Sequence, residues 1–73
     1  MRRAMIEQHL IETEQHIVHG EQLIAEQLEI IRDLQRDGHD TTKAREWLAT
    51  LEEAQRRNIA ERERIQQELW SAG

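Results

Sequence analysis

Four side chains near the start of the chain have the residue types and the spacing that metal binding or phosphoryl transfer uses. His9, Glu12, His16 and His19 follow one another at intervals of three or four residues, so a helix would carry all four on one face. Imidazole and carboxylate groups on one face can bind zinc or a similar ion. An exposed histidine on a helix can also attack a phosphoryl group as a nucleophile.

The residues expected opposite this face argue against a metal centre. Metal sites in helical bundles usually take ligands from facing helices. The facing segment offers Asn58, Arg62 and Gln66, and the guanidinium group of Arg62 would repel a cation. We therefore expect no metal and no other cofactor. The sequence instead predicts a polar layer between two helices, formed by Glu12, His16, Asn58 and Arg62.

Polar groups in a helix seam cost stability but fix the register and the number of partners. We expect Glu12 and His16 to contact Arg62, within the chain or across a dimer. Gly20, in the middle of a helix, would allow close approach of the facing helix or leave space for Asn58 or Arg62. Replacing both Gly20 and Asn58 by leucine is then expected to raise thermal stability and loosen the oligomeric state.

A phosphotransfer function is an alternative that depends on His16. The segment "HIVHG" is similar to the His-x-x-Lys-Gly segment of histidine phosphotransfer domains, which would make His16 the nucleophile. His19 stands where the lysine would be and is a weaker, titratable cation. No base with an orienting group accompanies His16. We therefore predict a protein that is not an enzyme and has no small-molecule substrate.

A small RNA-binding hairpin dimer is the second alternative. Arg56, Arg57 and Arg64 share the outer face of the second helix, but glutamates lie among them and no aromatic residue is placed to stack on bases. The net charge of −5 also disfavours nucleic acid, because binding it depends on neutralised phosphates.

The composition predicts an all-α protein. The 73 residues are enough for a single domain, 1–73, and contain no cysteine, no proline and only three glycines. Strong helix formers dominate and sheet formers are few. There is no apolar run long enough to cross a bilayer and no apolar signal-peptide core, so we expect a cytoplasmic protein that does not bind membranes.

The segment "RDGHDTT" divides the chain into two predicted helices, about 3–37 and 41–70. Gly38 can adopt the left-handed conformation that ends a helix. Asp40 can cap the next helix, with Thr41 as the competing cap. So short a connection predicts an antiparallel hairpin that pairs residues whose numbers sum to roughly 78, with Leu34 opposite Ala44 and Leu10 opposite Leu69.

Each predicted helix carries a stripe of residues alternating at four and three positions, typical of a coiled-coil seam. The stripes also contain Thr13, Gln27 and Gln55. The residues expected in the hairpin or dimer interface are Ile6, Leu10, Ile17, Gly20, Ile24, Ile31, Leu34, Leu48, Leu51, Ile65 and Leu69.

Apolar residues outside the stripes predict a partner. Met5, Leu23 and Ile30 lie beside the first stripe, Trp47 lies beside the second, and Ile11 begins a further line with Val18 and Ala25. One partner helix needs a narrower apolar face than this. We expect a homodimer of hairpins forming a four-helix bundle, or an unknown protein partner, with protein–protein association as the function.

The stretch "HIVHGEQLIAEQLEIIRDLQRDGHDTTKAREWLATLEEAQ", from His16 to Gln55, resembles a group of short, uncharacterised bacterial proteins. The resemblance is carried by the His-Ile…Gly-Glu start, the Asp-Gly-His-Asp-Thr turn at 37–41 and the closing Glu-x-x-Gln. Trp47 stands where the pattern usually has leucine. The resemblance covers a little over half the chain and implies a helical hairpin without implying an activity.

Overall fold

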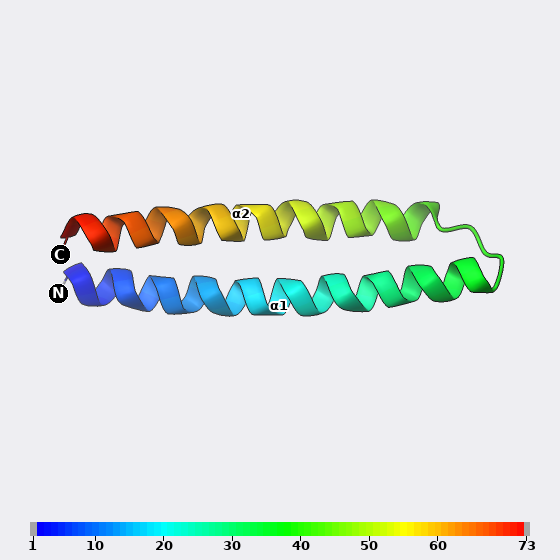
Figure 1. Ribbon diagram of the computed structural model, residues 1–73, viewed down its shortest axis with the longest axis horizontal. Coiled ribbons are helices and arrows are strands. Elements are labelled where there is room, and N and C mark those ends of the chain that lie inside the picture. The colour runs from blue at the N-terminus through cyan, green and yellow to red at the C-terminus, as the bar shows by residue number, and fades with distance from the viewer. Residues whose placement is uncertain (1, 73) are drawn as a thin grey trace.

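Two long antiparallel helices form the molecule (Figure 1). The computed structural model describes residues 2–72, with side chains described as far as 71; α1 spans Arg2–Arg36 and α2 spans Thr42–Ala72. The rod measures 55 Å by 14 Å by 12 Å. The predicted all-α hairpin is confirmed, and its helix bounds differ from the predicted ones by one or two residues. The ends of the predicted domain, residues 1 and 73, lie outside the described part.

The end of α1 is fixed by a Schellman motif around Gly38. Gly38 has a φ angle of 74°, in the left-handed region that a residue without Cβ adopts at low cost. The backbone N–H of His39 donates to the carbonyl of Leu34 at 2.8 Å, and the N–H of Gly38 donates to the carbonyl of Gln35 at 3.1 Å. These two bonds satisfy carbonyl groups that the helix end would leave unpaired.

Asp40 and Thr41 share the start of α2. The N–H of Arg45 donates to the carbonyl of Thr41 at 2.9 Å, which makes Thr41 the N-cap residue by backbone geometry. The carboxylate of Asp40 accepts from the N–H of Thr42 at 3.0 Å and from its hydroxyl at 2.7 Å. Both predicted caps therefore act, Thr41 through its backbone and Asp40 through its side chain.

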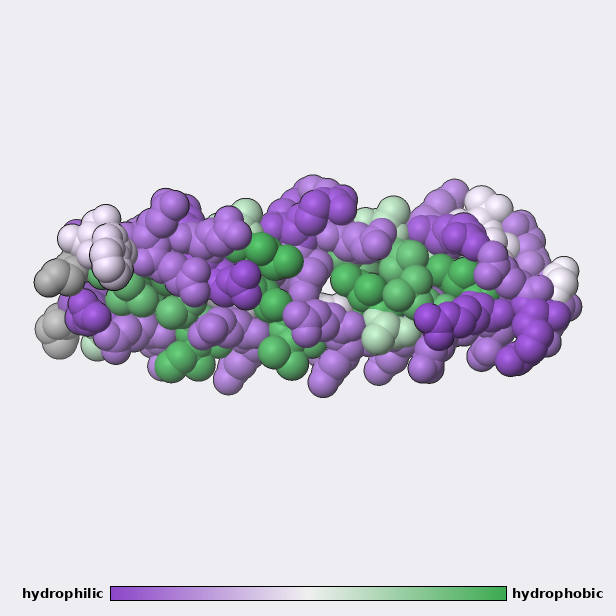
Figure 2. Space-filling model, viewed as in Figure 1, coloured by the Kyte–Doolittle hydropathy of each residue, from purple (hydrophilic) through white to green (hydrophobic). Residues whose placement is uncertain are grey.

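The two predicted stripes face each other along the rod. All the interface residues predicted from the sequence are buried or half-buried, and Ile17, Ile31 and Ile65 form the fully buried apolar core. Thr13, Gln27 and Gln55 are buried with them. In Figure 2 the apolar residues along the seam form two stretches, separated near the middle of the rod by hydrophilic side chains.

The pairing register differs from the prediction by one heptad. Gln27 donates from Nε2 to the carbonyl of Ala44 at 2.9 Å, and Gln55 donates from Nε2 to the carbonyl of Ile17 at 2.8 Å. The numbers of these pairs sum to 71 and 72, whereas the predicted register has a sum of about 78. Ala44 thus meets Gln27 instead of Leu34, seven residues further along.

The connection between the helices accounts for this shift. The chain does not fold back tightly at Gly38: in Figure 1 the end of α1 extends past the start of α2, and residues 37–41 run back along it. A shift of seven residues returns the same face of a helix to the seam. The stripes therefore remain buried while every partner across the seam changes, and Leu10 does not lie opposite Leu69.

No helix in the described part of the chain is both long and apolar enough to cross a membrane.

Candidate protein-binding surfaces

The predicted histidine face does not converge on a single point. His9, His16 and His19 are exposed along α1, and Glu12 accepts a hydrogen bond from the amide of Gln8 at 3.3 Å. Among the described residues, no group of three histidine or carboxylate side chains is arranged to hold a metal ion. His16 and His19 lie instead on the rim of a hollow between the helices.

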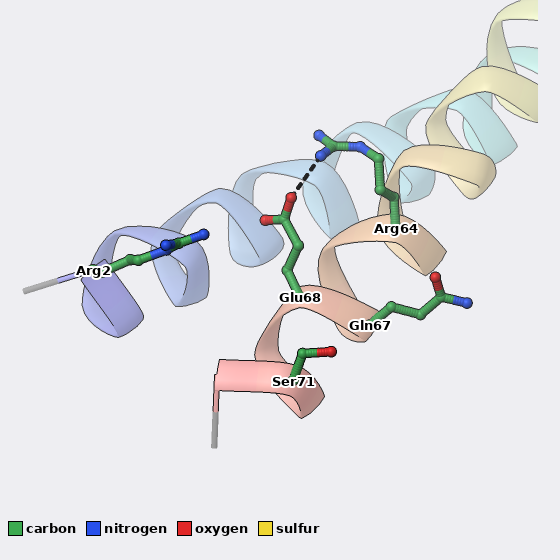
Figure 3. A pocket seen from close by; sticks show the side chains of 5 residues that line it. All are labelled: Arg2, Arg64, Gln67, Glu68 and Ser71. Atoms are coloured by element: carbon green, nitrogen blue, oxygen red, sulfur yellow. Dashed lines mark hydrogen bonds and ion pairs between the residues drawn. The ribbon is translucent and has the colours of Figure 1, made fainter.

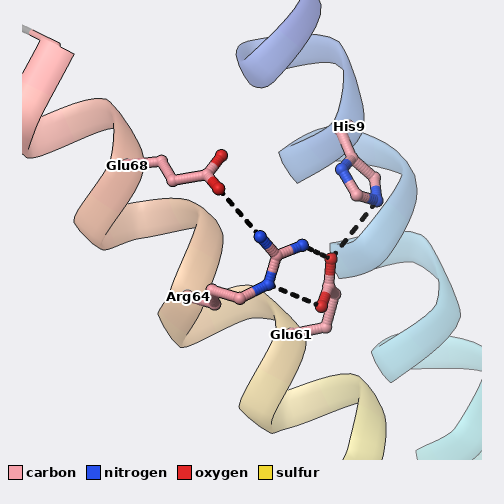
Figure 4. Close-up of polar contacts among 4 residues, drawn as sticks. All are labelled: His9, Glu61, Arg64 and Glu68. Atoms are coloured by element: carbon pink, nitrogen blue, oxygen red, sulfur yellow. Dashed lines mark hydrogen bonds and ion pairs between the residues drawn. The ribbon is translucent and has the colours of Figure 1, made fainter.

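His9 takes part in a polar cluster that links the two helices (Figure 4). Its Nε2 lies 3.7 Å from a carboxylate oxygen of Glu61. Arg64 donates to that same carboxylate and, through Nη1, to Glu68 at 2.8 Å. The contact between His9 and Glu61 joins α1 to α2, and Arg64 is shared by the two carboxylates of Glu61 and Glu68.

The same arginine borders an open polar cleft at the end of the rod where both termini lie (Figure 3). Arg2 from α1 and Gln67, Glu68 and Ser71 from α2 complete its lining. Arg64 and Glu68 pair with each other on the α2 side of the cleft, as the dashed line in Figure 3 shows. Ser71 and Glu68 both line the cleft, and among the described residues no hydrogen bond joins them.

Four charged groups have shifted pKa values, all from local pairing on α2 or at its start. The Thr42 hydroxyl and then its N–H hold the pKa of Asp40 below the ordinary value of 3.8. Hydrogen bonds from Arg56 and from Arg64 lower the pKa values of Glu53 and Glu61, respectively, below 4.5. The bond to Glu61 raises the pKa of Arg64. The main cause of each shift is therefore a hydrogen bond to a nearby side chain.

The predicted polar layer is centred on Gln55 and differs in its partners. A Cβ atom at Gly20 would lie 2.1 Å from Oε1 of Gln55, so the glycine creates the space that this buried amide occupies. Asn58 donates to the same oxygen at 3.4 Å. Arg62 is half-buried and, within residues 2–71, forms no ion pair with Glu12. Sequence reasoning placed Gln55 in the seam but did not identify its bond to the Ile17 carbonyl.

Beside this layer lies a hollow of about 210 Å³ that spans the groove between the helices. Leu23 lines it from α1, and Leu51 and Ala54 line it from α2. Ile30 follows Leu23 by seven residues, and Trp47 precedes Ala54 by seven, so helix geometry continues the apolar lining on both helices. We call the surface formed by Leu23, Ile30, Trp47, Leu51 and Ala54 the groove face.

Much of the groove face is open to solvent in the single chain. The exposed fractions are 49% for Ile30 and 54% for Trp47. Met5, which lies five helical turns before Leu23 on the same line, is 72% exposed. Large apolar side chains gathered on one side of two adjacent helices are typical of a surface that another chain covers.

No protein-family model, curated protein or solved structure matches this chain.

Proposed function

We propose that this protein is a non-catalytic association module, and that two copies pack through their groove faces to form a four-helix bundle. Support comes from the amount of surface that the single chain leaves exposed. Its accessible area is 5765 Å² for a mass of 8.7 kDa. A compact monomer of that mass is expected to expose about 4,700 Å². One hairpin therefore exposes more surface than a folded protein of its size normally does.

A second copy would cover an area in the range of stable dimers. Two hairpins packed to ordinary compactness would together expose about 7,900 Å², so their association would remove roughly 3,700 Å². Permanent homodimers bury about 2,000 to 5,000 Å². The groove face suits this role because both helices contribute to it, so two such faces stack as two layers of two helices.

The hollow beside Gly20 supports the same face. Leu23 and Leu51 are only half-buried around it, so an apolar side chain from a second copy would complete their packing. The opposite side of the rod also carries exposed apolar residues, Leu28 and Trp70. A cysteine-free chain is compatible with the cytoplasm, the compartment we propose for this protein.

Sedimentation equilibrium over the micromolar range tests the proposal. The wild-type protein is expected to be a dimer, and the double variant Ile30→Gln, Trp47→Gln to dissociate at least tenfold more readily. Both substituted side chains are about half exposed, so the variant should keep its helical circular dichroism spectrum. The matched control Ile11→Gln, Val18→Gln removes two apolar side chains elsewhere and should remain dimeric.

A wild-type protein that stays a compact, cooperatively melting monomer at high micromolar concentration would overturn this function. Equal weakening of the dimer by both double variants would place the interface outside the groove face.

A further inference from the structure

The outer surface of α1 carries a second heptad pattern that the hairpin does not use. Its members are Ile11, Val18 and Ala25 at intervals of seven, and Gln8, Gln15 and Gln22 at intervals of seven. Each glutamine precedes an apolar residue by three positions, which is the alternation of a coiled-coil seam. We call these six residues the outer stripe.

The outer stripe is accessible from solvent and separate from the groove face. All six residues are exposed, Ile11 at 49% and Val18 at 55%. Ile11, Gln15, Val18 and Gln22 line a shallow depression whose walls all come from α1. Neither α2 nor a second hairpin on the groove face would cover it.

Carboxylates border the outer stripe on both sides. Glu7, Glu14 and Glu21 repeat every seven residues along one border, and Glu12 and Glu26 lie on the other with His19 between them. The sequence has no lysine or arginine from residue 4 to residue 31. Among the ion pairs of residues 2–71, none joins Glu14, Glu21 or Glu26 to a basic side chain.

The charge pattern on α2 is different. Arg56 and Arg57 pair with Glu53, and Arg64 pairs with Glu61 and Glu68, so three of the six basic side chains of α2 are paired within their own helix. The borders of the outer stripe are therefore mainly negative: Glu7 pairs with Arg3, whereas Glu12, Glu14, Glu21 and Glu26 form no ion pair with a lysine or arginine among the described residues.

We propose that the outer stripe binds a basic amphipathic helix of another protein, roughly three heptads long. Apolar residues of that helix would pack against Ile11 and Val18, and its lysine or arginine side chains would pair with the bordering glutamates. A second copy of this chain fits poorly, because two outer stripes would set glutamates against glutamates. Nucleic acid and anionic lipid surfaces would be repelled.

This inference is independent of the dimer, because it concerns a different face and a different protein. The pairing resembles the docking of an amphipathic helix onto a surface through residues spaced at three and four positions. Complementary charge would accelerate encounter and make the affinity fall as salt is added.

A synthetic peptide provides the test. The probe is a fluorescently labelled helix of about three heptads with leucine and asparagine at the core positions and lysine at the flanking positions. Binding to the wild-type protein, followed by anisotropy in low salt, is expected in the micromolar range. The Ile11→Gln, Val18→Gln variant should bind at least tenfold more weakly, whereas Ile30→Gln, Trp47→Gln should bind as the wild type does.

Two control peptides separate a built site from simple charge attraction. A scrambled peptide of the same composition, and one with glutamate in place of lysine, should each bind at least tenfold more weakly than the probe. Equal binding of the scrambled peptide, or unchanged binding to the Ile11→Gln, Val18→Gln variant, would overturn the proposal. Loss of binding only in the Ile30→Gln, Trp47→Gln variant would also overturn it, by placing the peptide on the groove face.

Discussion

At the scale of single residues, the least expected feature is the dependence of a buried amide on a glycine. The end of the Gln55 side chain, which bonds the Ile17 carbonyl, occupies the space where a Cβ atom at Gly20 would lie, so a side chain at position 20 requires Gln55 to shift. The sequence alone predicts that leucine at positions 20 and 58 stabilises the protein. The geometry reverses this expectation for position 20, because any larger side chain would displace Gln55 from its hydrogen bond.

A double-mutant cycle tests this dependence. Gly20→Ala should destabilise the wild-type protein by about 1 kcal/mol, since the loss of a buried hydrogen bond outweighs the higher helix propensity of alanine. In a Gln55→Ala background the same change should stabilise by about 1 kcal/mol, because only the propensity remains. Urea denaturation measures both values, and equal effects of Gly20→Ala in the two backgrounds would refute the dependence.

Acid should destabilise the hairpin, in part through Asp40. Its pKa is lower in the folded state than the ordinary value of 3.8, so its contribution is present above that value and is lost as the pH falls through the folded pKa. The pKa values of Glu53 and Glu61 also lie below their ordinary value of 4.5 in the folded state, so their contributions to stability are likewise lost as the pH falls through the folded pKa values. The melting temperature is therefore expected to stay level from about pH 7 to pH 5 and to fall below about pH 4.

The Thr42→Val variant isolates the part due to Asp40, because valine keeps the shape of threonine and removes the donating hydroxyl. It should melt at a lower temperature than the wild type at neutral pH and lose less of its melting temperature on acidification. An unchanged difference between neutral and acidic melting temperatures would mean that the Thr42 hydroxyl does not stabilise the charged form of Asp40.

At the scale of the helices, the sequence predicted the elements and their buried faces but not the partners across the seam. The two stripes, the glycine at the end of α1 and the caps of α2 depend on residues close in sequence, so local patterns were sufficient. The register depends on where Gln27 and Gln55 find backbone carbonyls on the other helix. A heptad pattern cannot distinguish registers that differ by seven residues, because both bury the same face.

Cysteine cross-linking distinguishes the two registers. The chain has no native cysteine, so paired substitutions are unambiguous. In the structure the ends of the His9 and Glu61 side chains approach to 3.7 Å, so a short bis-maleimide reagent should join the two thiols of the His9→Cys, Glu61→Cys variant within one chain. His16→Cys, Glu61→Cys probes the register shifted by one heptad and should be joined much more slowly under the same conditions. The opposite result would support the register predicted from the stripes alone.

At the scale of the whole molecule, the histidine face shows the limit of sequence reasoning about sites. The spacing placed His9, His16 and His19 on one side of α1. The residues that surround these histidines come from α2, and the stripes did not determine the position of α2 along α1. His9 meets Glu61, and His16 lies on the rim of the hollow with Asn58. The sequence could predict that apolar residues lie outside the stripes, but it could not predict which of them form the groove face, because that face combines residues from both helices.

Tryptophan emission can report which face a second copy covers. Trp47 lies on the groove face and Trp70 is 89% exposed at the other end of α2. In a Trp70→Phe variant, the emission of Trp47 should move to shorter wavelength as the protein concentration rises through the dimerisation range. In a Trp47→Phe variant, the emission of Trp70 should stay at long wavelength throughout. A shift confined to Trp70 would assign the dimer contact to the opposite side of the rod.

The position of both chain ends at one end of the rod has a mechanical consequence (Figure 1). Tension applied to the two ends would load the contacts between the helices one after another, as in opening a zipper, instead of shearing them all at once. The Gln55–Ile17 hydrogen bond would break before the Gln27–Ala44 hydrogen bond, because the second lies nearer the turn. We expect such a geometry to open at low force and to close again from the turn.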